Sequence, residues 1–388
     1  MVMRSCCMDD TTCYGRSAQC PRDGHVAPRA RVKRHDWQRQ GPRFRCERCG
    51  MVVAATTGTA SGGRRTDLHT SLRGATALAE GVSLRATGRL VRGDQETVNP
   101  WLPVLGQHGQ GVMHAFCRTL PLHECHLEEL WTCIHTQEGH LTPPEHLAAV
   151  SGEAWVWMAF SPVDQVGPAW VVGKRPLRSA RRRLLRRTSA TEGSMPCFPS
   201  DARPHDAHAL LAVYGVWDTP PRHGRRGRVP HPRRDPPPEV CDAVVVTERA
   251  HGRVVHVTTR LVSGTTEHGA TALRMSPVRR TITTDGVERQ HVTVRQHARR
   301  MGRTVHAFST DPASLEAQRT VACAYAHCVI PHRRLRQRFA CPLPPKGGKG
   351  SSKTWKSVPP AMAAGLTDHV WTMDALLSFR VPPKSLWL

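Results

Sequence analysis

Apolar residues that alternate with polar ones dominate the middle of the chain and predict β-strands there. The predicted strands lie at residues 127–134, 154–160, 169–173 and 195–198. The apolar spacing changes to a helical period in the last part of this region, and the predicted helices lie at residues 179–188 and 206–214. We therefore expect an α/β fold with a mixed sheet flanked by helices, within a domain at 125–345.

A segment rich in proline, arginine and histidine follows these elements, at residues 220–238, and predicts a loop. Residues 243–246 and 253–261 then alternate as the two strands of a hairpin. We interpret residues 216–280, approximately, as an insertion in the domain. Residues 346–388 predict a Gly/Lys/Ser linker and a C-terminal tail with a short amphipathic segment.

Helical periodicity also marks residues 65–120, with a break at Gly93 and Asp94. A helix over 79–91 and a second over 94–99 are expected, with Ser83 and Asp94 as N-caps. Pro100 is expected to kink the second helix.

Such a helix-turn-helix inserts its second helix into the DNA major groove. Gln95 and Asn99 would then contact base edges, and Arg85 and Arg89 would lie near phosphates. The alternative is an ordinary helical hairpin whose arginines are solvated.

Four cysteines in residues 1–60 form two pairs that predict a zinc-ribbon-like module with one structural Zn²⁺. The pairs are Cys13 with Cys20, and Cys46 with Cys49. The spacing of Cys46 and Cys49 is typical of zinc ligands, whereas that of Cys13 and Cys20 is wider than usual. The alternative is that Cys13 and Cys20 are free thiols. The remaining cysteines are scattered and predict reduced thiols.

The charge balance is strongly basic, with 55 Lys and Arg against 31 Asp and Glu, a net charge of +24. Such a field favours polyanions, above all nucleic acid. Arginine supplies nearly all of the charge, a bias that a GC-rich genome also produces, so charge alone does not establish DNA binding. No run approaches the roughly 18 apolar residues of a membrane-spanning helix, and residues 1–10 lack a signal-peptide core, so we expect a soluble cytoplasmic protein.

Three acidic positions within this basic chain suggest metal-assisted chemistry on a phosphate backbone. Glu288 lies near the start of a basic helix, Asp201 follows a strand, and Glu128 and Glu129 lie in the first strand, where alternation lets only one face the site. Two Mg²⁺ ions held by carboxylates can activate a nucleophile and neutralise a leaving oxygen. For any one of these residues, the alternative is a solvated surface charge.

Several segments, in this order, resemble the catalytic domain of bacterial insertion-sequence transposases of the DDE class. They are Glu128-Glu129-Leu130-Trp131, Ala154-Trp155-Val156-Trp157-Met158-Ala159-Phe160, Val172-Gly173-Lys174-Arg175, Ser200-Asp201 and Val287-Glu288-Arg289. The resemblance implies an RNase H-like fold that cuts and joins DNA with Mg²⁺. The family's second carboxylate corresponds to Asp201 and its third to Glu288, whereas Glu128 stands where the family has Asp.

The resemblance also implies how DNA is bound. A zinc ribbon and helix-turn-helix would recognise terminal inverted repeats in double-stranded DNA, and work on two ends implies at least a homodimer. The arginines expected to line the DNA path are Arg289, Arg295, Arg299 and Arg303, the last three on one helix face. The alternative is a decayed or repurposed transposase that binds DNA without catalysis, because the extra methylene of Glu128 moves its carboxylate by about 1.5 Å.

Overall fold

The computed structural model divides the chain into two compact units. One unit comprises Met1–Phe116 with Ala317–Leu388, and the other comprises Cys117–Glu316. Residues 317–345, assigned from the sequence to the domain at 125–345, group with the first unit. The structure describes residues 18–19, 26–27, 43–45, 52–54, 56, 58–62, 66–118, 120–144, 151–174, 177–190, 195–201, 204–219, 231–251, 253–275, 285–302, 309–345 and 350–381.

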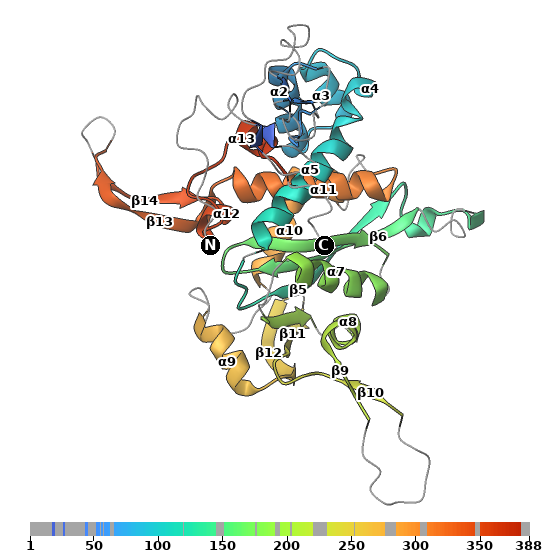
Figure 1. Ribbon diagram of the computed structural model, residues 1–388. Coiled ribbons are helices and arrows are strands. Elements are labelled where there is room, and N and C mark those ends of the chain that lie inside the picture. The colour runs from blue at the N-terminus through green and yellow to red at the C-terminus, as the bar shows by residue number, and fades with distance from the viewer. Residues whose placement is uncertain are drawn as a thin grey trace, which may run out of the picture. The chain divides into compact units, whose positions relative to one another are not determined.

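A six-stranded mixed sheet forms the centre of the unit Cys117–Glu316 (Figure 1). Its strands are β5 (His126–Ile134), β6 (Gly152–Ser161), β7 (Val166–Gly173), β8 (Cys197–Asp201), β11 (Cys241–Ala250) and β12 (Arg253–Ser263). Their order is β12-β11-β8-β5-β6-β7. The first three strands form an antiparallel meander, β8 runs parallel to both β5 and β11, and β12 pairs antiparallel with β11.

Helices α7 (Leu177–Ala190) and α8 (Pro204–Tyr214) lie in the connections that lead to the parallel strands β8 and β11. They cover one face of the sheet, where Trp157, Leu184, Phe198 and Leu210 form a buried core. Alternation along each strand therefore sends every second side chain into this core and the others to the opposite face.

The opposite face is covered by segments that follow the hairpin β11–β12. Helix α9 (Thr266–Met275) approaches Leu261 and Cys241 at Gly269. Cys241 belongs to a second buried cluster, and Leu261 packs against that cluster. Helix α10 (Asp285–His297) and the 3₁₀ turn η3 (Arg299–Met301) contact β5. The hydroxyl of Thr132 in β5 donates to the carbonyl of Arg300 at 3.4 Å, which fixes η3 on this face.

The mixed sheet flanked by helices is confirmed, as are the six predicted strand runs, which correspond to β5 to β8, β11 and β12, and helices α7 and α8. The loop predicted at 220–238 is wrong in part, because β10 (Arg233–Asp235) pairs there with β9 (Val216–Asp218). Helix α11 (Pro312–Cys328) lies near the end of the range 125–345, where no helix was predicted. A short 3₁₀ turn, η2 (Glu138–His140), lies between β5 and β6.

The other unit is built mainly from helices. They are α2 (Leu68–Ala79), α3 (Leu84–Leu90), α4 (Gln95–Val98), α5 (Trp101–Cys117), most of α11, α12 (Pro360–Ala363) and α13 (Met373–Ser378). A Cβ at Gly106 would lie 2.7 Å from Cα of Ala317, and one at Gly109 would lie 3.3 Å from the Thr320 side chain. Glycine is therefore what allows α5 and α11 to approach so closely.

Paired strands complete this unit. They are β1 (Ala18–Gln19) with β2 (Val26–Ala27), β3 (Arg43–Arg45) with β4 (Val52–Ala54), and β13 (His332–Leu343) with β14 (Lys353–Val358), all antiparallel. None of the helices in the described ranges has the length and apolar character needed to cross a membrane.

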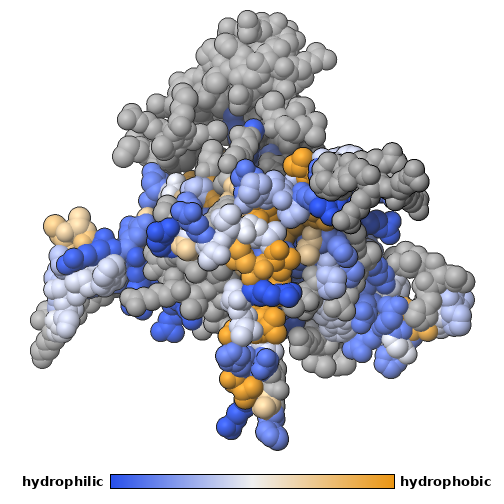
Figure 2. All heavy atoms as spheres, turned by 90° about the horizontal axis from the view of Figure 1, so that it is seen from below, coloured by the Kyte–Doolittle hydropathy of each residue, from blue (hydrophilic) through white to orange (hydrophobic). Residues whose placement is uncertain are grey.

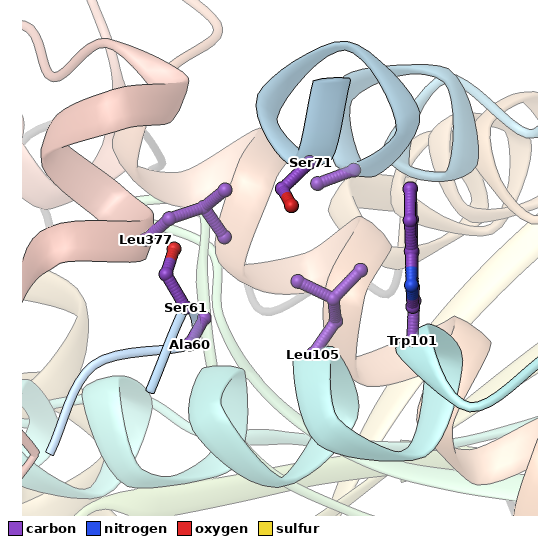
Figure 3. Close-up of a pocket in the computed structure, with 7 residues that line it drawn as sticks. Ala60, Ser61, Ser71, Trp101, Leu105 and Leu377 are labelled. Carbon is purple, nitrogen blue, oxygen red and sulfur yellow. The ribbon is translucent and has the colours of Figure 1, made fainter. Parts of the chain in front are cut away.

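Helices α2, α5 and α13 meet around a small hollow, shown in Figure 3. Its lining consists of Ala60, Ser61, Ser71, Ala75, Trp101, Leu105 and Leu377. Nearby, His108 Nε2 donates to the carbonyl of Leu376 at 2.9 Å, and burial lowers the pKa of His108. The hollow has room for about one water molecule, so it is a packing defect rather than a ligand site.

Candidate functional site

Two of the predicted carboxylates lie on one face of neighbouring parallel strands. Leu127 of β5 is paired in register with Ser200 of β8, so Glu128 and Asp201 are the next neighbours across the ladder. Neighbouring strands lie about 4.8 Å apart. Glu128 is 8% exposed, while Asp201 is half-buried at the end of β8. The fold thus brings together two acidic residues that are far apart in the sequence.

Glu129 lies on the opposite face of the sheet. It pairs with Trp157 of β6, and Trp157 belongs to the core beneath α7 and α8 together with Leu184. Of the two adjacent glutamates, Glu128 is therefore the one that shares a face with Asp201.

Glu288 lies in α10, as the sequence predicts, and α10 contacts the strand that carries Glu128. Thr132 shares the face of Glu128 by alternation, and its bond to Arg300 places the turn after α10 on that face. The side chains of Glu288 and Arg289 lie outside the described residues. Among the side chains that are described, no group of three or more His, Cys, Asp or Glu is placed to hold a metal ion.

A buried arginine supports the backbone of Glu128 from the α7 side. Arg183 Nη1 donates to the carbonyls of Glu128 at 3.4 Å and Met158 at 3.5 Å, and Nη2 donates to the carboxylate of Asp206. Its guanidinium lies 5.4 Å from the ring centroid of Trp157. Because Glu128 and Met158 lie on adjacent strands, these hydrogen bonds from Arg183 fix the backbone of β5 and β6 at Glu128.

A second buried polar pair, His126 and Glu124, lies on the same face as Glu128, two and four residues before it in the sequence. His126 Nε2 and Glu124 Oε1 are 2.5 Å apart, and the side chains are 0% and 2% exposed. Glu124 before β5, and His126, Glu128 and Thr132 within it, therefore lie on one face, and so many polar side chains are unusual for a central strand.

Asp242 carries a shifted pKa on the other side of the sheet. It is paired in register with Phe198 and so faces α8. Burial, with a smaller contribution from the negative charge of Asp206, raises the pKa of Asp242 to about 6. This group belongs to the packing under α8 and not to the face of Glu128.

The helix predicted over 79–91 is wrong in its first part, because α2 ends at Ala79 and α3 begins only after Ser83, whereas the turn and the second helix, α4, are confirmed. The hydroxyl of Ser83 accepts a backbone N–H in the first turn of α3, whereas Asp94 caps α4 without a side-chain bond. After α3, Arg92 takes a left-handed conformation with φ 55°, and the N–H of Gly93 bonds to the carbonyl of Gly88 at 2.9 Å. A Cβ at Gly88 would lie 2.8 Å from the Gly93 carbonyl oxygen, so this turn requires glycine.

The residues expected to contact DNA in this element are mostly accessible. Arg85, Arg89 and Asn99 are exposed, and half-buried Gln95 accepts a hydrogen bond from Arg85 Nε at 3.0 Å. The kink predicted at Pro100 is wrong, because α4 is a single turn and Pro100 stands between it and α5. Proline lacks a hydrogen-bonding N–H, which costs nothing at the start of a new helix.

The predicted row of three arginines on one helix face is also wrong. Helix α10 ends at His297, the backbone of Ala298 leaves the helical region with φ −123° and ψ 75°, and Arg299 begins η3. Ala298 is fully buried, so packing against the sheet ends the helix there. Arg295 is half-buried, Arg299 is exposed, and Arg303 lies outside the described residues.

The four predicted zinc ligands, Cys13, Cys20, Cys46 and Cys49, lie outside the described residues. The antiparallel strands β3 and β4 stand on either side of residues 46–51. None of the cysteines that the structure does describe forms a disulfide bond.

Sequence reasoning missed the hairpin β13–β14, and only the charge pattern of this segment indicated that it carries a basic surface. No Asp or Glu occurs between Glu316 and Asp368, while several Arg and Lys do.

The chain matches no protein-family model, and a search of the curated proteins found no relative.

Proposed function

We propose that this protein is a DNA transposase whose catalytic domain has an RNase H-like fold. The observation that carries the proposal is the adjacency of Glu128 and Asp201 on one face of neighbouring parallel strands. An antiparallel meander followed by two parallel strands, with helices in the connections, is compatible with such a fold. The ordered resemblance to insertion-sequence transposases supplies the reaction.

Glu128, Asp201 and Glu288 would hold Mg²⁺, whose ligands are hard oxygen donors of this type. When bound, two such ions activate a nucleophilic oxygen and neutralise the leaving oxygen of a phosphodiester. Glu128 and Asp201 fit this role by donor chemistry and by their shared face. Arg183 is a positioning residue, because it holds the carbonyl of Glu128 from the opposite side of the sheet.

The helix-turn-helix would recognise the terminal inverted repeats of the element. Exposed Arg85 and Arg89 on α3 provide phosphate contacts, and Asn99 stands accessible at the end of α4. Two DNA ends require at least a homodimer on DNA, and the net charge of +24 favours the encounter. A zinc ribbon in residues 1–60 remains part of this proposal.

A second candidate function is DNA binding without catalysis, by a decayed or repurposed transposase. One observation favours it: Glu128 is longer than the aspartate of the family pattern and is nearly buried at 8% exposure. A misplacement on the order of 1 Å can cost roughly a hundredfold in rate.

Strand cleavage and joining on DNA that carries the sequences flanking the coding region tests both candidates. With Mg²⁺, the native chain should nick and transfer this DNA, and Asp201→Asn and Glu288→Gln should abolish both steps. Asp218→Asn, which removes an exposed carboxylate in the same unit, is the matched control and should retain activity. Thermal melting by circular dichroism establishes that each variant is folded.

The outcome for Glu128→Asp separates the two candidates. If the native chain binds the ends without cutting and Glu128→Asp restores cutting, the protein is a transposase disabled at its first carboxylate. If folded native and Glu128→Asp chains both bind and neither cuts, the non-catalytic function is correct. Activity that survives Asp201→Asn would refute the proposed site.

A further inference from the structure

The hairpin β13–β14 is a two-stranded ribbon that pairs, among the described residues, with no other strand. In Figure 1 it is the orange-red pair of long arrows, and in Figure 2 it is the arm at the left, which shows blue and pale spheres with one orange patch. An isolated antiparallel hairpin is at best marginally stable in water. Contacts with α12 hold one part of this ribbon, whereas most of its other side chains are exposed or only half-buried.

One face of the ribbon is exposed and carries both charge and an aromatic side chain. Arg338 is paired in register with Trp355, and Arg336 with Ser357, so these four residues share a face. All four are exposed, and the Trp355 side chain is 49% exposed. Residues of the other face, such as Gln337, are half-buried, so the face of Arg336 is the more accessible one.

The charge around this face has one sign. No acidic residue occurs in the sequence between Glu316 and Asp368, a stretch that holds the whole ribbon. The basic residues of the two strands are Arg333, Arg334, Arg336, Arg338, Lys353 and Lys356. Like charges on one face of a sheet destabilise it, and a polyanion bound to that face would remove this repulsion.

We propose that this exposed face binds the phosphate backbone of double-stranded DNA. Arg336 and Arg338 contact phosphates, and Trp355 inserts its apolar ring toward the bases of the adjoining groove. The inference rests on the proposed function for its choice of DNA as the polyanion. It adds a binding element that is separate from both the helix-turn-helix and the carboxylates.

Dimensions agree with this partner. A two-stranded β-ribbon fits the major groove of B-DNA. Residues two apart in a strand are about 6.7 Å apart, so Arg336 and Arg338 can each reach a different phosphate of the duplex.

The test is fluorescence anisotropy of a labelled DNA duplex of arbitrary sequence, titrated with the full chain without Mg²⁺ at several salt concentrations. The plot of log Kobs against log salt has a negative slope, and each phosphate that a protein cation neutralises contributes about −0.9 to it. Arg336→Gln/Arg338→Gln should therefore make this slope less steep by about 1.8. The matched control is Arg253→Gln/Arg260→Gln, which removes the same charge from exposed positions of β12. This control should leave the slope near that of the native chain.

Trp355→Ala should weaken binding by roughly tenfold without changing the slope, because tryptophan contributes contact area and no charge. Trp355→Phe should restore most of the affinity, because it keeps an aromatic ring at this position. Melting temperatures of all variants identify any loss of structure.

An unchanged slope in Arg336→Gln/Arg338→Gln would overturn the proposal, and is the result expected if the ribbon binds an acidic protein surface instead. An equal fall in both double variants would also overturn it, because the effect would then come from net charge alone. The duplex has arbitrary sequence and the assay lacks Mg²⁺, so the result is independent of end recognition and cleavage. A failed cleavage experiment would therefore leave this inference standing.

Discussion

Breaking the buried ion pair between Arg183 and Asp206 should destabilise the unit Cys117–Glu316 strongly. The two side chains are 0% and 1% exposed, and Arg183 also donates to two strand carbonyls. Asp206→Asn keeps the shape but leaves the guanidinium charge buried without its counter-charge. Removing one partner of a buried pair costs about 3–5 kcal/mol. We expect a decrease of this size in the free energy of unfolding.

The exposed pair Arg233 and Asp235 supplies the control. Its atoms lie 3.1 Å apart, but the side chains are 66% and 42% exposed, and such pairs contribute about 0–1 kcal/mol. Asp235→Asn should therefore shift the urea midpoint of the same unit only slightly.

Urea unfolding followed by circular dichroism measures both variants, and Arg183→Met/Asp206→Leu completes the comparison. Apolar side chains of similar volume avoid the buried charge, so this double variant should be considerably more stable than Asp206→Asn and close to the native chain. A decrease below about 1 kcal/mol in Asp206→Asn, matching the exposed control, would refute the reasoning. It would mean that the buried guanidinium finds other compensation.

Two further predictions concern packing and pH. Gly106→Ala should destabilise the helical unit by about 1–3 kcal/mol, because the new methyl carbon would lie 2.7 Å from Cα of Ala317. The control is Gly139→Ala, because no atom lies within 4 Å of a Cβ at Gly139. Equal shifts in the melting temperatures of the two variants would contradict the prediction. The second concerns Asp242, whose pKa is raised in the folded protein from 3.8 to about 6. The folded state then binds more protons than the unfolded chain, so this group makes the free energy of unfolding fall as pH rises through that interval. Asp242→Asn should flatten the fall in urea titrations at several pH values and stabilise the protein at neutral pH; an unchanged pH profile would argue against the shift.

The central sheet could be predicted because the sequences of its strands are apolar runs or alternate strongly between apolar and polar residues. Helix α11 could not, since its buried residues include Gln318, Arg319, Thr320 and His327, which give no apolar stripe in the sequence. The hairpin β13–β14 was missed for the opposite reason. Its exposed, polar strands lack the buried face that makes a strand recognisable.

The candidate site was predictable in its residue types and less so in its geometry. The choice between Glu128 and Glu129 depends on the register with Trp157, which only the folded sheet defines. The support from Arg183 joins a helix to two strands through contacts at long sequence separation. Local patterns do not encode such contacts, and the early end of α10 at Ala298 depends likewise on tertiary packing.

The discontinuous helical unit has a consequence for synthesis of the chain. Its N-terminal helices leave the ribosome well before α11, whose residues Ala317 and Thr320 fill the space beside Gly106 and Gly109. The unit Cys117–Glu316 emerges complete in between and can fold first. The glycine surface of α5 stays uncovered until α11 has been synthesised, so nascent or prematurely terminated chains expose it to chaperones and proteases.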